Sequence, residues 1–200
     1  MWARLESNTI VEILPRPKAL QIGGVQYPSN IFSMWSNSEL AAIGIVPVTI
    51  DDTNFKDKNY YINTDITYAY DTETGKATGT YGTATAKAIA DTLYTAQDET
   101  DGLGTEGEVK EKGLKTLHKE RINAQAGSIL QQTDWMVVRA AEGGTAVPSS
   151  TTTKRAAVRT KANAMCTQID AASDVDALAA LYVYNNDTPP VRPLGELPTV

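Results

Sequence analysis

The sequence predicts an α+β protein in which a small N-terminal antiparallel β unit precedes a C-terminal helical hairpin or bundle. Residues 1–82 alternate apolar and polar side chains and are rich in β-branched and aromatic residues, as strands are. After about residue 109 the apolar residues recur at steps of three and four, which is the helical period. The acidic, glycine-rich run DETDGLGTEGE between them is typical of a linker. We therefore expect a β-rich N-terminal unit with a short helix over 1–97, a linker over 98–108, a helical unit over 109–184 and an extended proline-rich tail over 185–200.

Composition narrows the class of partner. The chain has 200 residues, 42% of them apolar, and a net charge of −6, which argues against nucleic acid and against an anionic membrane surface. Its first residues lack the basic start and apolar run of a signal peptide, and no stretch approaches the ~18–20 apolar residues of a membrane span. A single cysteine, Cys166, excludes an intrachain disulfide and is expected to be a small core residue.

The expected β unit contains two hairpins around one short helix. Residues 2–14 flank the turn-forming pair Ser7-Asn8. Ser36 and Glu39 have the spacing of a capping box, which predicts a helix over 37–43 that Gly44 ends. The β-branched stretch 45–50 returns to a strand, and Pro47 favours an edge position for it. A second hairpin, over 59–82, turns at residues 73–76.

The chain then becomes helical in character. The alanine-rich stretch 83–98 predicts a modest helix. A longer helix to about Gln132 would bury Leu114, Leu117, Ile122 and Ile129. In the segment 154–169 the apolar stripe comprises Val158, Ala162, Met165 and Ile169. Ser173 is expected to cap a last short helix.

The segment ILQQTDWMVVRAAEGGTAVP interrupts the helices with a tryptophan. Thr133 or Asp134 can cap a new turn, and Gly143-Gly144 can close it. We interpret Trp135 as a buried structural anchor that pins this piece to the 154–169 helix, and Trp35 as the corresponding anchor of the β unit.

Several patterns resemble chemical sites but lack the context that such sites need. The run GLGTEG at 102–107 matches a dinucleotide-binding motif, yet no strand precedes it. The stretch 51–58 has lysine at a ligand position of a calcium loop. His118, the only histidine, lies beside two lysines on the expected solvent side of its helix, with no cluster of metal ligands. We therefore expect no catalytic residues, no metal and no cofactor.

Tyrosines are the better candidates for function. Tyrosine is favoured at protein interfaces because it combines an apolar ring with a polar tip. The β unit holds more tyrosines than a thin sheet can bury, and a core role for one face is the alternative. The candidate interface residues are Tyr60, Tyr61, Tyr68, Tyr70 and Tyr81.

Two parts of the chain resemble proteins of tailed-bacteriophage tails. Residues 119–170 resemble the helical end modules of tail-fibre assembly proteins and tail assembly chaperones, in which a helix ends in "TDW", a proline-bearing turn follows, and the next helix carries "R…VR". The stretches MWARLESNTIVEIL and YPSNIFSMWSNSELAAIGI resemble the start of small phage tail proteins. Together these segments cover about half of the chain, and residues 149–153, SSTTT, depart from the pattern.

The resemblance implies a non-enzymatic virion-associated protein. Its members help fibre chains to fold and trimerise, and some remain on the fibre, so the expected function is a fibre assembly chaperone retained in the virion. The alternative is a structural protein of the fibre, baseplate or tail, and a cell-wall hydrolase is the third hypothesis.

The resemblance also implies a class of partner and a location. The expected partner is a β-rich, oligomeric tail-fibre or other tail protein. Association of this chain with copies of itself, as a homo-oligomer within the virion, is a second expectation. The expected location is the host cytoplasm during assembly and then the virion tail. Because the β unit carries the excess of tyrosines and the acidic balance, it is expected to make the main contacts with the fibre.

Overall fold

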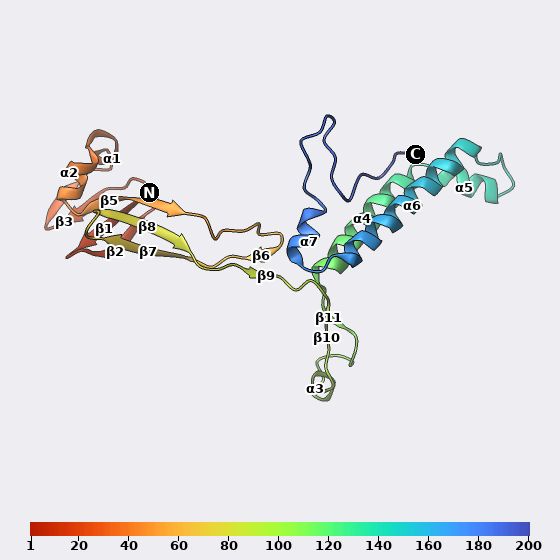
Figure 1. The fold of residues 1–200 in the computed structure, drawn as a ribbon, viewed down its shortest axis with the longest axis horizontal. Helices are drawn as coiled ribbons and strands as arrows, with labels where there is room; N and C mark the ends of the chain where they lie inside the picture. Colours follow the sequence, from red (N-terminus) through yellow and green to blue (C-terminus); the bar gives the residue numbers. More distant parts are fainter. The chain divides into compact units, whose positions relative to one another are not determined.

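A computed structural model describes all residues from Met1 to Val200 and confirms the α+β class (Figure 1). The chain forms two compact units, Met1–Thr85 and Ala86–Val200. The boundary therefore falls between Thr85 and Ala86 and not in the segment 98–108, which the sequence predicts to be the linker. None of the helices combines the length and the apolar character needed to cross a membrane.

The first unit is built on a five-stranded sheet with the order β2-β1-β5-β8-β7. Both predicted hairpins are confirmed, because β1 pairs with β2 and β7 pairs with β8, each antiparallel. Ser7 and Asn8 both have positive φ, 50° and 64°, as a two-residue hairpin loop of type I′ requires. The sheet is mixed and not purely antiparallel, because β5 and β8 run parallel. Its strands are β1 (Trp2–Glu6), β2 (Thr9–Leu14), β5 (Ile45–Asp51), β7 (Ile66–Asp71) and β8 (Lys76–Tyr81).

Strand β5 is central, so the prediction that Pro47 would place it at an edge is wrong. The first half of β5 pairs with β1, where Trp2 faces Pro47, and the second half pairs with β8 from Val48 onward. The amide of Val48 points towards β1, where it donates to the carbonyl of Met1. Because amides alternate along a strand, the missing N–H of Pro47 faces the β8 side, just before pairing with β8 begins.

Two core clusters lie on opposite faces of this sheet. One contains Ala3, Val46 and Ala77. The other brings Leu14 and Ile45 against the covering segments β3 (Leu20–Ile22), β4 (Val25–Tyr27), α1 (Ile31–Met34) and α2 (Asn37–Ala42).

The predicted capping box of α2 is present, since the Ser36 hydroxyl accepts from the amide of Glu39 and the Glu39 carboxylate accepts from the amide of Ser36. Gly44 ends the helix with φ 79°, as expected, and a Cβ there would lie 2.7 Å from the carbonyl oxygen of Leu5.

Gly79, in β8, leaves room for a tyrosine ring. Its neighbours across the sheet are Ile50 on β5 and Tyr68 on β7. A Cβ at residue 79 would lie 2.8 Å from side-chain atoms of Ile50, Ile66 and Tyr68. The absence of a side chain at Gly79 therefore lets Tyr68 lie against the sheet.

We expect Gly79→Ala to lower the free energy of unfolding of the first unit by about 1–3 kcal/mol, because the added methyl group overpacks three side chains. Thr80→Ala, at the next and exposed position of β8, is the matched control and should change stability by less than about 0.5 kcal/mol. Urea denaturation of both variants measures the difference. Equal stability of the two variants would contradict this packing argument.

The stretch 83–98 is not the helix that its alanine content predicts. It contains β9 (Thr85–Ala86), which pairs with β6 (Tyr61–Ile62), then β10 (Thr92–Leu93) and the start of α3 (Ala96–Thr100). Strand β10 pairs with β11 (Val109–Glu111), where a helix is expected from residue 109. The expected linker is thus folded into a hairpin, residues 92–111, which we name the acidic arm (Figure 1).

The remaining chain forms the predicted helical hairpin. Helices α4 (Leu114–Gln131) and α6 (Ser149–Ala171) pack side by side, and α5 (Asp134–Ala141) connects them (Figure 1). The predicted stripe of α6 is confirmed as fully buried. The stripe of α4 is different from the prediction, because Leu117 is 45% exposed and the buried positions are Leu114, His118, Ile122 and Ala126.

The last segment folds back onto the helices. Helix α7 (Val175–Ala180) is capped by Asp174, one residue after the predicted Ser173. Residues 185–200 contain no helix or strand, as expected for an extended tail. The tail nevertheless has a buried anchor, because Leu194 is 0% exposed and its carbonyl accepts a hydrogen bond from Lys161 Nζ on α6.

Candidate functional site

Most of the five candidate tyrosines make contacts within the first unit. Tyr60 is buried, which contradicts its assignment to an interface, and Tyr70 packs against the cluster of Ala3, Val46 and Ala77. The ring of Tyr68 lies beside Gly79, and Lys56 Nζ lies 4.4 Å from the ring centre of Tyr61. Trp35, the expected anchor of this unit, packs partly buried against the second core cluster.

Tyr81 and Tyr68 do line one surface hollow of about 440 Å³ in the first unit. The rings of Tyr81 and Phe55 are 5.0 Å apart, and Lys58 Nζ lies 5.6 Å from the Phe55 ring centre. The other lining residues include Asn63 and Asp65. The amide of Asn63 is already engaged, because it bonds both the backbone N–H and the carbonyl of Lys56. The Asn63 side chain is therefore not free to bind a ligand in this hollow.

Trp135 is exposed, so the prediction that it anchors the helical unit is wrong. Its side chain belongs to α5, which contributes no buried residue to the unit. Trp135, Val137 and Val138 are 55%, 42% and 54% exposed. The guanidinium of Arg139 lies 5.0 Å from the indole ring centre. We name Trp135, Val137 and Val138 the α5 face.

Arg155, and not Trp135, joins α5 to the rest of the hairpin. Its guanidinium donates to the Leu130 carbonyl and the Thr133 hydroxyl at 2.6 Å each, and to the Asp134 carboxylate at 2.7 Å. The side chain of Arg155 is only 8% exposed. Thr133 takes the predicted N-cap position, but its hydroxyl makes no cap hydrogen bond and accepts from Arg155 instead. The break between α4 and α5 thus supplies the partners of this arginine.

The sequence contains a signal for Arg155 in the spacing of α6. Arg155 precedes Val158 by three positions and so extends the buried stripe of the helix by one step. A stripe assigned from apolar residues alone omits it. A long, partly apolar side chain can take a core position when its charged end finds partners.

His118 is buried and not on the solvent side of its helix, which corrects the prediction. It lies four residues from both Leu114 and Ile122, so the spacing of the buried stripe could have located it. Its Nδ1 is 2.7 Å from the Tyr182 hydroxyl. Burial lowers the pKa of His118, and the positive charge of Arg121 acts in the same direction. The geometry and the pKa both favour a neutral structural histidine.

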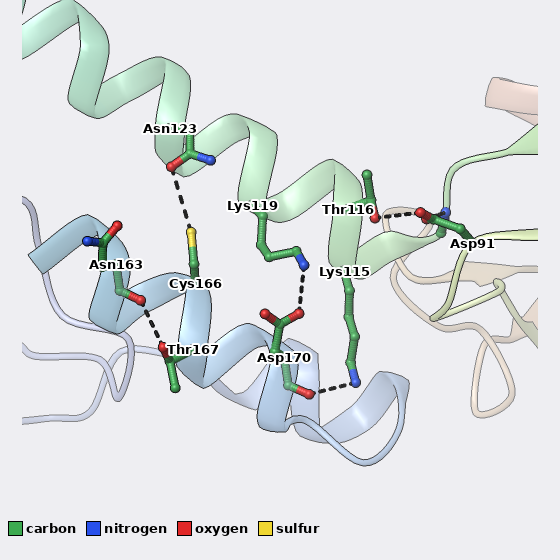
Figure 2. A network of polar contacts seen from close by, with 10 residues as sticks. Asp91, Lys115, Thr116, Lys119, Asn123, Asn163, Cys166, Thr167 and Asp170 are labelled. Atoms are coloured by element: carbon green, nitrogen blue, oxygen red, sulfur yellow. Dashed lines mark hydrogen bonds and ion pairs between the residues drawn. The ribbon is translucent and has the colours of Figure 1, made fainter. Parts of the chain in front are cut away.

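Polar contacts join the start of α4 to the end of α6 (Figure 2). Lys119 pairs with the Asp170 carboxylate at 2.7 Å, which raises the pKa of Lys119, and Lys115 donates to the Asp170 carbonyl.

Cys166 lies beside the buried stripe of α6 and is partly exposed, so it is not the small core residue that the sequence predicts. Its sulfur is 3.8 Å from the Asn123 side-chain oxygen, and burial raises the pKa of the thiol. A thiol with a raised pKa is a poor nucleophile at neutral pH.

The tail forms the wall of two further hollows. One, of about 450 Å³, lies between the end of α7 and the tail and includes Val183, Tyr184 and Val191. Arg192 lies 5.4 Å from the Tyr184 ring centre and pairs with Glu196, whose carboxylate accepts from the Tyr184 hydroxyl at 2.6 Å. These contacts hold the tail in place.

No three His, Cys, Asp or Glu side chains lie close enough together to hold a metal ion. Comparison of the chain with family models, with curated proteins and with solved structures finds no match. Function must therefore be inferred from the surface features themselves, and the α5 face is the largest exposed cluster of apolar side chains on one helix.

Proposed function

We propose that this chain is a non-enzymatic binding protein of a bacteriophage tail, acting as a tail-fibre assembly chaperone that is retained in the virion. The observation that carries the proposal is the α5 face. It lies within residues 119–170, the segment that resembles the helical end modules of tail-fibre assembly proteins. A structural protein of the fibre, baseplate or tail, without a chaperone role, is the alternative.

The α5 face has the properties of a binding surface. Its three large side chains are about half exposed and pack into no core. Tryptophan is enriched among the residues that dominate binding energy, and Arg139 beside it adds a second favoured residue type. We therefore assign the main contact with the partner to α5 and not to the β unit, whose tyrosines are largely used within their own unit.

The double substitution Trp135→Ser with Val138→Ser should weaken binding to the fibre protein of the same phage by about thirtyfold or more, the loss typical of one binding hot spot. Stability should change by less than about 1 kcal/mol, because both side chains are exposed. Calorimetric titration measures binding, and urea denaturation measures stability. Val25→Ser, at a residue that is 53% exposed in the first unit, is the matched control and should bind normally.

The chaperone role has its own test. Fibre protein is produced with and without this chain, and its soluble yield and trimer content are compared. Unchanged yield and trimer content would refute the chaperone role and favour the structural alternative. Mass spectrometry of purified particles then separates a retained protein from a transient one.

A further inference from the structure

The acidic arm, residues 92–111, is folded but contributes nothing to a core. Every residue of β10 and β11 is exposed, and no buried residue lies in the arm. A lone two-stranded hairpin is marginally stable in water, so other contacts must hold it.

The base of the arm is clamped to the start of α4. The Asp91 carboxylate accepts from the Gly113 amide at 2.7 Å and from the Thr116 hydroxyl at 2.9 Å (Figure 2 shows the second contact). These bonds lower the pKa of Asp91, so the clamp is ionised at neutral pH. A Cβ at Gly113 would lie 2.3 Å from the carbonyl of Ala90, so the backbone of the two segments is in direct contact.

Contacts within the arm fix its shape. The pairing of β10 and β11 shifts register between Thr92 and Leu93, which leaves Lys110 as the extra residue of a bulge. Lys110 pairs with Asp98 at 2.6 Å, and Asp98 in turn completes a capping box with Thr95 at the start of α3. The arm is therefore ordered before any partner arrives, which reduces the entropy that binding must overcome.

The arm carries an exposed apolar pair. Leu93 and Val109 face each other across the two strands, and each is 47% exposed. Side chains paired across strands lie on the same face, so the two form one contact surface. Leu103, near the closed end of the arm, is 60% exposed.

The charge of the arm is predominantly negative. Residues 92–111 contain six carboxylates and one lysine, so five of the six net negative charges of the chain belong to the arm. Lys110 neutralises Asp98, and no ion pair within the chain involves the other carboxylates. These are Glu99, Asp101, Glu106, Glu108 and Glu111.

We propose that the acidic arm is a docking surface for a basic polypeptide. Apolar side chains of the partner would cover Leu93 and Val109, while its lysine or arginine residues pair with carboxylates of the arm. The complementary charge sets the partner class, because it speeds encounter and disfavours acidic competitors. This inference is independent of the tail-fibre proposal, since it uses neither the resemblance nor the α5 face.

The test uses the full-length protein and a fluorescently labelled 14-residue peptide in which lysine alternates with valine. We expect saturable binding by fluorescence anisotropy that weakens as salt rises, because exposed ion pairs are screened. Leu93→Thr with Val109→Thr places a residue of high β-propensity at both strand positions and should weaken binding about tenfold or more. Glu106→Gln, Glu108→Gln and Glu111→Gln together should do the same.

The matched control removes three negative charges from the first unit in place of the three removed from the arm. Asp52→Asn, Asp65→Asn and Glu73→Gln, all exposed in the first unit, should leave binding within about twofold of the original protein. A peptide of alternating lysine and serine should bind at least about tenfold more weakly than the lysine–valine peptide. Equal binding of both peptides, unchanged binding by the arm variants, or an equal loss in the control triple would each overturn the proposal.

Discussion

Arg155→Met is expected to lower the free energy of unfolding of the helical unit by about 2–4 kcal/mol, although it places an apolar side chain in a buried position. Methionine retains the aliphatic stem, so the packing beside Val158 is largely preserved. The loss comes from three hydrogen bonds made by a charged group, each of which contributes about 1.5–3 kcal/mol in proteins. Part of it is offset, because the Asp134 side chain is 53% exposed and can be hydrated, and the amide of Thr133 still donates to the Leu130 carbonyl.

Two controls separate this role from a general effect of charge. Arg159→Met removes an exposed arginine from the same helix and should change stability by less than about 0.5 kcal/mol. Asp134→Asn removes the charge of the half-exposed partner but keeps an accepting oxygen, and should cost less than about 1 kcal/mol. Urea denaturation followed by circular dichroism at about 222 nm reports mainly the helical unit. Equal effects of Arg155→Met and Arg159→Met would contradict the assigned role.

Leu194→Ala is expected to lower the free energy of unfolding by about 2–5 kcal/mol, the range for large-to-small substitutions at buried sites. Leu194 is 0% exposed although it lies in a segment without regular structure. Its amide donates to the Leu181 carbonyl, and its own carbonyl accepts from Lys161. Removing the side chain should therefore loosen the tail as well as leave a cavity.

Urea denaturation measures the stability of this variant, and limited proteolysis with mass spectrometry measures release of the tail. New cleavage is expected within residues 185–200 before the helices are cut. Val191→Ala is the matched control, because this tail residue is 52% exposed and should be replaceable within about 0.5 kcal/mol. A Leu194 variant as stable and as protease-resistant as the Val191 variant would show that Leu194 does not anchor the tail.

The sequence by itself determined the elements whose cause is local. The hairpin turn at Ser7-Asn8, the capping box of Ser36 and Glu39, and the stripe of α6 each depend on residues a few positions apart. The α+β class follows from the same local periods. Steric limits on backbone angles and hydrogen bonds between near neighbours act wherever these residues occur. The sequence is therefore sufficient to predict these elements.

Only the tertiary structure decided which side chains are covered and by what. Alanine content favours a helix over 83–98, but β9 pairs with β6, and the second half of the segment belongs to the acidic arm, where the Tyr94 amide donates to the Glu108 carbonyl and Asp91 accepts from the Gly113 amide. Pro47 lies in a central strand because its pairing partner changes at that residue.

Tertiary contacts also decided that Trp135 is exposed and that Arg155 is buried. Trp135 is the residue that hydrophobicity alone would bury, yet Arg155 takes the core position, because a carbonyl of α4, the hydroxyl of Thr133 and a carboxylate of α5 meet there. The partners of Arg155 lie 21 to 25 residues away along the chain. Whether a polar or charged group can be buried depends on such distant partners, which no local pattern contains.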